Sequence, residues 1–370
     1  TVNTEGTNVP IHLIDKFSRN LNSMRYLAIQ FKVEYINTAG NLITVGVVNS
    51  DLYNIFNGYL KFTDVLDLAN TPLTQNTGNN FGYPIPQKFT LDVDTGEFLS
   101  NAPTTQYANI NDYGTLAFLT ISTIPSKIRL VYYDSTGTQI GTESADITSG
   151  SNYTTQSEVN KSLFYFGCFP ANLRNWSTIF RGLVTAGTIQ GGYYTTEPLN
   201  ISDQNFGTKY TFNVNCPTLK GYEPIRLCWL NQWGAWDYYT FTMKSSKMIS
   251  TKGSTYQQLE GSWNESTYKI NGFKGGKKAF RVNATEKITM NTDFVNESES
   301  EWFEELINSP EVYILEGYED IVETTSALNQ YVVPVRLTTS SYTKKTVAND
   351  KIMQYTFEVE KSKTLRTQAV

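Results

Sequence analysis

The chain alternates apolar and polar residues over short runs, which is the pattern of β-strands with one covered face. Such runs occupy residues 27–35, 128–133, 210–214, 225–230, 238–243, 288–294, 312–315, 332–337 and 353–359. Asn, Gly, Ser and Pro separate them at the spacings typical of β-sandwiches. We therefore expect an all-β protein made of consecutive β-sandwich modules, followed by a C-terminal β domain with one helix.

The expected boundaries follow the same runs. Residues 1–100 and 101–200 are predicted to form one β-sandwich module each. Residues 201–245 form an aromatic-rich β segment that could begin a third module, and residues 246–370 form the C-terminal β domain.

A weak repeat supports this division. Three segments read aromatic, any residue, Asn or Asp, two further residues, then Gly, and their aromatic residues are 97 positions apart in both steps. They are Tyr35/Asn37/Gly40, Tyr132/Asp134/Gly137 and Trp229/Asn231/Gly234. An Asn or Asp side chain opens such a turn, and Gly supplies the positive φ that closes it. Two interpretations stay open: three unrelated hairpins, or three sandwich modules of immunoglobulin-like size.

One segment of the last third has helical spacing. Ser298 and Glu301 fit a capping box, and an apolar stripe follows at Trp302, Phe303, Leu306 and Ile307. Pro310 ends the pattern. The sequence predicts one short helix over 299–308 and a total helix content below about 10%.

Composition narrows the possible functions. Aromatic residues make up 14% of the chain, charged residues only 18%, and the net charge is −5. We expect neither nucleic-acid binding, which usually requires a basic excess, nor membrane insertion, since no run of 18 apolar residues occurs. The N-terminus lacks the pattern of a signal peptide. Three sparse cysteines, Cys168, Cys216 and Cys228, predict buried free thiols and synthesis in a reducing cytoplasm.

Catalytic and metal-binding patterns are scarce. The single histidine, His12, leaves little basis for a metal site or a histidine-based triad. The glycine-rich segment 272–277 lacks the spacing of a phosphate-binding loop, and Asp92 to Glu97 lacks ligands for a calcium loop. A pair of carboxylates for glycoside hydrolysis needs no sequence adjacency, so that class stays open. We expect no enzymatic activity, no cofactor and no metal.

Charge is segregated in the last third. Residues 293–323 contain eleven acidic residues and no Lys or Arg, whereas residues 244–281 contain eight basic residues and two acidic ones. The two stretches are either solvated faces of one domain or a complementary contact that sets register between subunits. The interface candidates are Lys274, Lys277, Lys278, Glu304, Glu305 and Glu311.

Aromatic residues cluster at Trp229, Trp233, Trp236, Tyr238 and Tyr239. The cluster predicts a cross-strand ladder inside a sheet. A protein interface or a sugar-stacking platform are the alternatives, so the three tryptophans are also interface candidates.

Two segments carry a family resemblance. Arg226 to Phe241 reads RLCWLNQWGAWDYYTF, and a second match comprises 300–313, 333–335, 340–342, 349–351 and 354–360. Both resemble structural proteins of tailed bacteriophages, notably tail or baseplate proteins of phages that infect Bacteroidota. The resemblance covers about residues 222–370 and implies no catalytic residues.

The resemblance implies a non-enzymatic, tail-associated structural protein of the virion, made in the host cytoplasm. Its expected partners are copies of itself and other virion proteins, with host surface glycans as a further candidate. Few charged residues suit large permanent interfaces. Two alternatives stay open: a carbohydrate-binding or adhesive β protein at a fiber tip or cell surface, and a polysaccharide-degrading enzyme.

Overall fold

Strands dominate the structure, with 51% strand and 12% helix. The computed structural model describes residues 17–18, 24–27, 30–49, 53–56, 97–120, 126–146, 162–205, 207–215, 221–262, 265–270, 272–316, 332–339, 341, 343, 353–363 and 366–369. The chain divides into two compact units. Unit 1 comprises Thr1–Cys216 and Leu230–Asp237, and unit 2 comprises Pro217–Trp229 and Tyr238–Val370.

Two sheets form the larger part of unit 1. The four-stranded sheet has the order β1 (Phe17–Ser18), β11 (Ser162–Phe166), β8 (Leu116–Thr120) and β6 (Glu97–Phe98). The five-stranded sheet has the order β10 (Gln139–Asp146), β9 (Lys127–Tyr133), β12 (Tyr193–Leu199), β13 (Tyr210–Asn215) and β7 (Thr105–Asn109). β13 and β7 run parallel, while the other neighbours are antiparallel.

Aromatic side chains fill the core of unit 1. Phe98 of β6 contacts Phe118 of its own sheet and Tyr210 of the other sheet, with ring centroids 4.9 Å apart in each pair. The two sheets therefore share apolar contacts. β9 alternates buried and half-buried residues, whereas β12 is buried from Tyr194 to Leu199, as expected of a strand covered on both faces.

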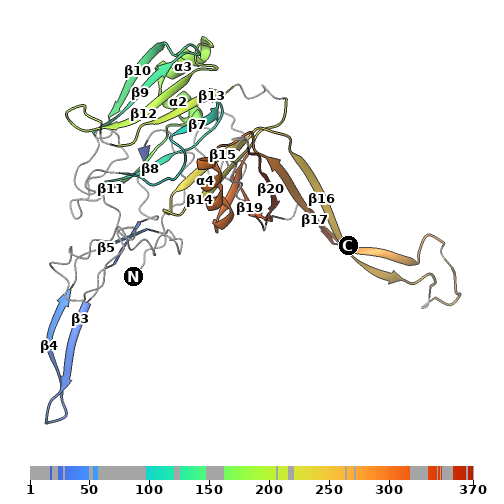
Figure 1. The fold of residues 1–370 in the computed structure, drawn as a ribbon. Helices are drawn as coiled ribbons and strands as arrows, with labels where there is room; N and C mark the ends of the chain where they lie inside the picture. Colours follow the sequence, from blue (N-terminus) through green and yellow to red (C-terminus); the bar gives the residue numbers. More distant parts are fainter. Residues whose placement is uncertain are drawn as a thin grey trace. The chain divides into compact units, whose positions relative to one another are not determined.

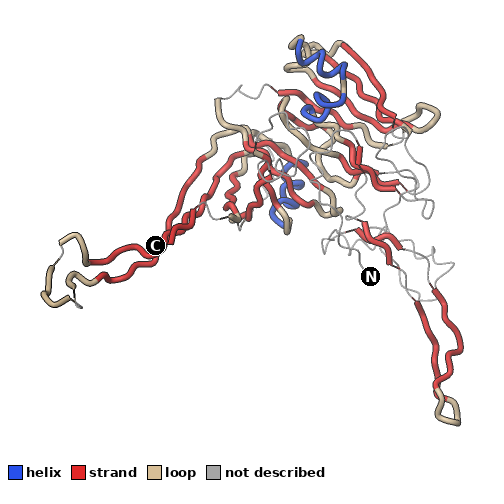
Figure 2. Tube along the Cα trace, turned by 180° about the vertical axis from the view of Figure 1, so that it is seen from behind, coloured by secondary structure: helices blue, strands red, loops and turns tan. Residues whose placement is uncertain are grey.

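Two helices cover one part of the five-stranded sheet (Figure 2). They are α2 (Pro170–Trp176) and α3 (Thr178–Thr185). Pro170 begins α2, where its missing N–H leaves no hydrogen bond unmade. The Ser177 hydroxyl caps α3 by accepting the Phe180 N–H at 2.9 Å. Phe180 then packs on Tyr132 of β9, with ring centroids 5.6 Å apart.

Unit 2 contains most of an eight-stranded sheet. Its order is β15 (Trp236–Phe241), β14 (Ile225–Leu230), β18 (Val312–Leu315), β19 (Val332–Leu337), β20 (Thr356–Lys361), β17 (Gly276–Asn291) and β16 (Ser246–Gln258), with β21 (Arg366–Ala369) also paired to β17. The turn between β14 and β15, residues 230–237, is grouped with unit 1.

Helix α4 (Glu297–Asn308) packs on this sheet (Figure 1). Its Trp302 ring lies 4.9 Å from that of Trp229 on β14, and its Phe303 ring lies 5.5 Å from that of Phe357 on β20. The predicted helix and its apolar stripe are confirmed. The predicted capping box is two residues late, because Asn296 is the N-cap and exchanges hydrogen bonds with Glu299.

β16 and β17 form a long hairpin, residues 246–291, which we call the arm. Residues 287–291 of β17 pair with β20, and residues 281–284 pair with β21. From Gly276 to Ala279 the pairing given by the described structure is with β16 alone. The arm therefore continues past the rest of its sheet (Figure 1). Its register shifts at Ser254/Thr255, where Phe280 is the extra residue of a β-bulge.

A second bare hairpin lies near the N-terminus. β3 (Gln30–Ile36) pairs with β4 (Leu42–Asn49), and we call this the N-terminal hairpin. Every residue of both strands is exposed. The register shifts between Val33 and Glu34, where Val45 is the extra residue of a bulge. Another pair, β2 (Met24–Leu27) and β5 (Tyr53–Phe56), forms a separate two-stranded sheet.

The three repeated turns have the same hydrogen bonds. The side-chain oxygen of Asn37, Asp134 or Asn231 accepts the backbone N–H groups two and four residues later. The glycine three residues on has φ between 74° and 84° in each turn. A fourth turn at Asn200 repeats the pattern, with Asp203 at φ 60° in place of glycine. The motif therefore encodes a hairpin turn, whatever sheet surrounds it.

Two features of the predicted fold class need correction. The structure is mostly β, as expected, but a sandwich arrangement is not confirmed. The prediction of a single helix is wrong, because α2 and α3 occur between strands where no helical spacing had been recognised. The boundaries at residues 100, 200 and 245 stay a prediction.

Candidate functional site

Trp229, the first tryptophan of the aromatic cluster, is a core residue. Its exposed fraction is 0%, and it packs on Trp302 of α4. Tyr239 on the neighbouring strand contacts Phe303 of the same helix, with ring centroids 4.8 Å apart. Burial raises the pKa of the Tyr239 hydroxyl, with the nearby carboxylates of Glu299 and Asp293 adding to the effect. Trp229 thus has no surface of its own left for a partner.

Trp233 and Trp236 are half-buried around the β14–β15 turn. The Trp233 Nε1 donates a hydrogen bond to Asn101 Oδ1 at 3.1 Å. The Asn231 side chain donates to the Leu99 carbonyl at 2.8 Å. All of these residues belong to unit 1, so the turn is held by several hydrogen bonds within that unit. An interface role for Trp233 and Trp236 stays a prediction.

The basic candidates lie at the end of the arm. Lys277 and Lys278 start β17 and Lys274 precedes it, and all three are exposed. Gly275 and Gly276 between them have φ of 95° and 74°, which identifies a turn in this glycine-rich segment. Exposed aromatic residues accompany the lysines, and the Lys274 Nζ lies 5.7 Å from the Phe273 ring centroid. Such a mixture of cationic and aromatic groups is suited to an interface.

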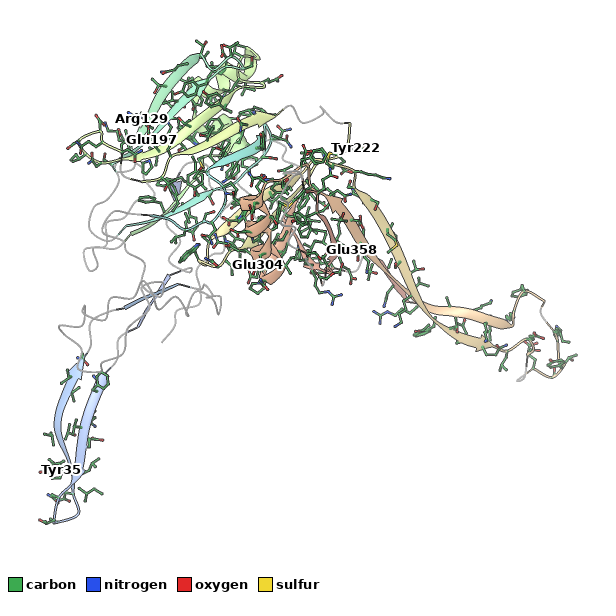
Figure 3. All side chains as sticks on the ribbon, in the orientation of Figure 1. Tyr35, Arg129, Glu197, Tyr222, Glu304 and Glu358 are labelled. Carbon is green, nitrogen blue, oxygen red and sulfur yellow. The ribbon has the colours of Figure 1, made fainter. Side chains whose placement is uncertain are left out.

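The acidic candidates differ among themselves. Glu311 is exposed, Glu304 on α4 is half-buried (Figure 3), and Glu305 is only 1% exposed. Glu305 therefore belongs to the interior of unit 2. The exposed acidic residues of α4 are instead Glu297 and Glu301, neither of which is among the predicted interface candidates.

Burial and a neighbouring acid change the pKa of Glu299, which lies on the first turn of α4. Burial raises the pKa of its carboxyl group, and the carboxylate of Asp293 raises it further. Negative charge near a helix N-terminus is ordinarily favourable. The raised pKa means that burial and the neighbouring acid outweigh that benefit at this residue.

The lysines at the end of the arm lie far from α4 of the same chain. Lys277 is 14 residues before Asn291, where β17 pairs with β20, and this is about 45 Å of extended strand. α4 packs on the sheet itself and has 12 residues, or about 18 Å of helix. The end of the arm therefore cannot reach α4 of its own chain.

A polar cluster around Glu143 has a structural role. Tyr132 and Ser177 both donate hydrogen bonds to the same carboxylate oxygen of Glu143. Burial raises the pKa of Tyr132, and the Glu143 carboxylate raises it further. Because the Ser177 oxygen also caps α3, this serine is held in place on both sides. The cluster ties α3 to β9 and β10.

Other chemical candidates gain no support. Within the described residues, no three His, Cys, Asp or Glu side chains are placed to hold a metal ion. His12, Cys216, Asp92 and Asp94 lie outside the described residues. Cys168 and Cys228 are buried free thiols, and burial raises the pKa of Cys228 to about 12, so its thiol stays protonated.

Comparisons and membrane-spanning potential give two further findings. No protein-family model matches the chain, and no curated protein matches it. No helix of the described part of the chain is long and apolar enough to cross a membrane.

Proposed function

We propose that this chain is a non-enzymatic structural subunit of a tailed-phage particle, associated with the tail, that acts by packing against its own copies and other virion proteins. The resemblance of segments 226–241 and 300–360 to tail and baseplate proteins supports the virion role. The arm is the observation that carries the assembly role.

The arm has the properties of a connection between subunits. Its strands are 13 and 16 residues long, and its far end pairs only with itself among the described strands. Large apolar side chains are exposed along it, with Phe273 at 77% and Ile270 at 69%. A two-stranded hairpin is marginally stable in water, so ordering such a surface is best explained by a partner that covers it.

Charge indicates where the arm would dock. Its end carries Lys274, Lys277 and Lys278, and the exposed acids on and after α4 include Glu297, Glu301 and Glu311. Since the arm cannot reach α4 of its own chain, the complementary contact is available only between chains. Such a head-to-tail contact joins different surfaces of two subunits, and it forms a ring when the rotation closes.

Charge reversal tests this proposal. Lys277→Glu/Lys278→Glu and, separately, Glu301→Lys/Glu311→Lys should each abolish higher-order species, because like charges then face each other across the contact. Combining all four changes should restore part of the assembly. Size-exclusion chromatography with light scattering, together with electron microscopy, measures the outcome. Wild-type assembly should weaken as salt rises from about 0.1 M to about 1 M.

A matched control separates the contact from general charge effects. Lys209→Glu/Lys363→Glu makes the same change of charge at two exposed lysines outside residues 246–291, and it should assemble as the wild type does. The assembly proposal fails if the arm variant and this control assemble equally well while both remain folded by circular dichroism.

A further inference from the structure

The N-terminal hairpin has one apolar face and one polar face. Residues paired across antiparallel strands share a face. The apolar face consists of the pairs Phe31/Val48, Val33/Gly46 and Tyr35/Ile43. The opposite face carries Gln30/Asn49, Lys32/Val47, Glu34/Thr44 and Ile36/Leu42.

Polar side chains on the opposite face find hydrogen-bond and ion-pair partners within the hairpin. Gln30 donates a hydrogen bond to Asn49 at 2.9 Å, and the Thr44 hydroxyl donates to Glu34 at 3.1 Å. Lys32 forms an ion pair with Glu34. Its one cation and one anion therefore neutralise each other, while Ile36 and Leu42 at the turn end of this face are 70% and 64% exposed.

The large side chains of the apolar face are exposed. Phe31, Val33 and Val48 are 59%, 60% and 66% exposed, and Tyr35 near the turn is 52% exposed (Figure 3). Two strands of seven paired residues cover about 10 Å by 23 Å. The face is thus on the order of a few hundred Å², comparable with the largest apolar patch of a typical monomer, which is often functional.

The centre of the apolar face matches itself. Val33 stands beside Gly46, where an added Cβ would meet nothing within 4 Å. A ridge and an open notch therefore lie side by side, flanked on either side by an aromatic–aliphatic pair. A two-fold axis through this centre would set each Val33 into the Gly46 notch of the other copy, which is the self-complementarity that an isologous contact requires.

We propose that this apolar face packs against the same face of a second copy of the chain, and this inference rests on the proposed assembly function. The face carries no charge, so two copies meet without repulsion. Two such hairpins would stack as sheets do, about 10 Å apart. Because the contact lies at the small end of specific interfaces, it acts together with other contacts in a larger assembly.

The test places one charge on either face of the full-length chain. Val33→Lys puts a lysine at the centre of the apolar face, where two copies would oppose like charges, and it should weaken self-association at least tenfold. Val47→Lys makes the same change on the opposite face, at a position that is 49% exposed, and should leave association unchanged. Both substitutions are made in the arm-reversal variant, Lys277→Glu/Lys278→Glu, in which the arm contact is already lost. Analytical ultracentrifugation then measures the association that remains.

Cross-linking gives a second readout. Val33→Cys should be joined into a covalent dimer by a short bis-maleimide, which bridges thiols that are too far apart for a direct disulfide, whereas Val47→Cys and the wild-type chain should not. Equal cross-linking by the two cysteine variants would overturn the proposal. So would a Val33→Lys chain that loses thermal stability without a change in mass, since the face would then be covered by its own chain. If the arm contact alone proves wrong, the Val33→Cys cross-link still tests the contact between two N-terminal hairpins.

Discussion

The N-terminal hairpin and the β14–β15 hairpin have the same turn and opposite surroundings. In both, an asparagine side chain accepts two backbone N–H groups, and a glycine at positive φ closes the turn. Asn231 is buried and also bonds to the Leu99 carbonyl. Asn37 is only half-buried, and the strands on either side of it are exposed. The local sequence thus specifies the turn, while neighbouring segments specify the burial.

This difference separates a hairpin that stabilises its own chain from one whose apolar residues are left for a partner. Trp229 and Phe31 occupy strands that lead into equivalent turns. One is entirely buried, and the other is 59% exposed. Comparable substitutions in the two hairpins should therefore act on different properties: folding in one, association in the other.

The largest expected effect is on the two aromatic residues. Trp229→Ala should lower the free energy of unfolding of unit 2 by about 3–5 kcal/mol, because a buried ring packed on Trp302 is lost. Phe31→Ala should change it by less than about 0.5 kcal/mol in dilute, monomeric protein. Urea denaturation followed by tryptophan fluorescence and circular dichroism measures both. A loss at Phe31 as large as that at Trp229 would contradict the exposed position of the N-terminal hairpin.

The second largest loss of stability is expected from substitution of the asparagines in the two turns. Asn231→Ala leaves the Ala235 N–H and the Leu99 carbonyl buried without their partner, so we expect a loss of about 2–4 kcal/mol. Asn37→Ala exposes the equivalent groups to water, and the loss should be about 0.5–1 kcal/mol. Chemical denaturation of both variants tests the ratio. Similar losses would show that burial does not distinguish the two turns.

The smallest effect concerns pH. The Thr136 hydroxyl and the N–H groups of Thr138 and Thr136 hold the pKa of Asp134 below its ordinary value of 3.8. The depressed pKa means that this carboxylate stabilises the turn above its unfolded pKa, and that this contribution is lost as pH falls through the folded pKa. Asp134→Asn should remove this pH dependence. Denaturation of the wild type and the variant at pH 7 and at successively lower pH values gives the difference directly.

A reciprocal variant serves as the control for this prediction. Asn37→Asp should introduce a similar loss of stability at low pH, because the same backbone N–H groups would then bind a carboxylate. If neither substitution changes the pH dependence, the turn hydrogen bonds contribute little to folding.

Much of the fold could be predicted where burial and local chemistry agree. β14, β18 and β19 have the predicted boundaries because alternation or continuous burial marks them clearly. α4 was recognised from its apolar stripe, although Asn296 proved to be the cap. α2 and α3 were missed because each is too short to show a repeating stripe, although Pro170 and Ser177 were available as start signals.

The candidate surfaces were predictable only in part. Charge segregation located the basic end of the arm, but sequence spacing did not reveal that Glu305 faces the interior. β16 and residues 276–287 of β17 were not predicted, because Ser, Thr and Lys interrupt the apolar alternation in these strands. The alternation of β3 was recognised as a strand. Its exposure depends on the absence of a covering neighbour among the described residues, which sequence pattern does not encode.

The bulges in the two bare hairpins have a consequence for the fate of the free protein. An exposed strand edge can add further strands without limit, which leads to fibres. Val45 and Phe280 each interrupt the regular ladder of their hairpin near its middle, and a bulge twists the strand and breaks the flat edge that such growth needs. The unassembled subunit can therefore display long apolar hairpins and still be directed to closed assemblies that use faces, instead of open-ended aggregation along its edges.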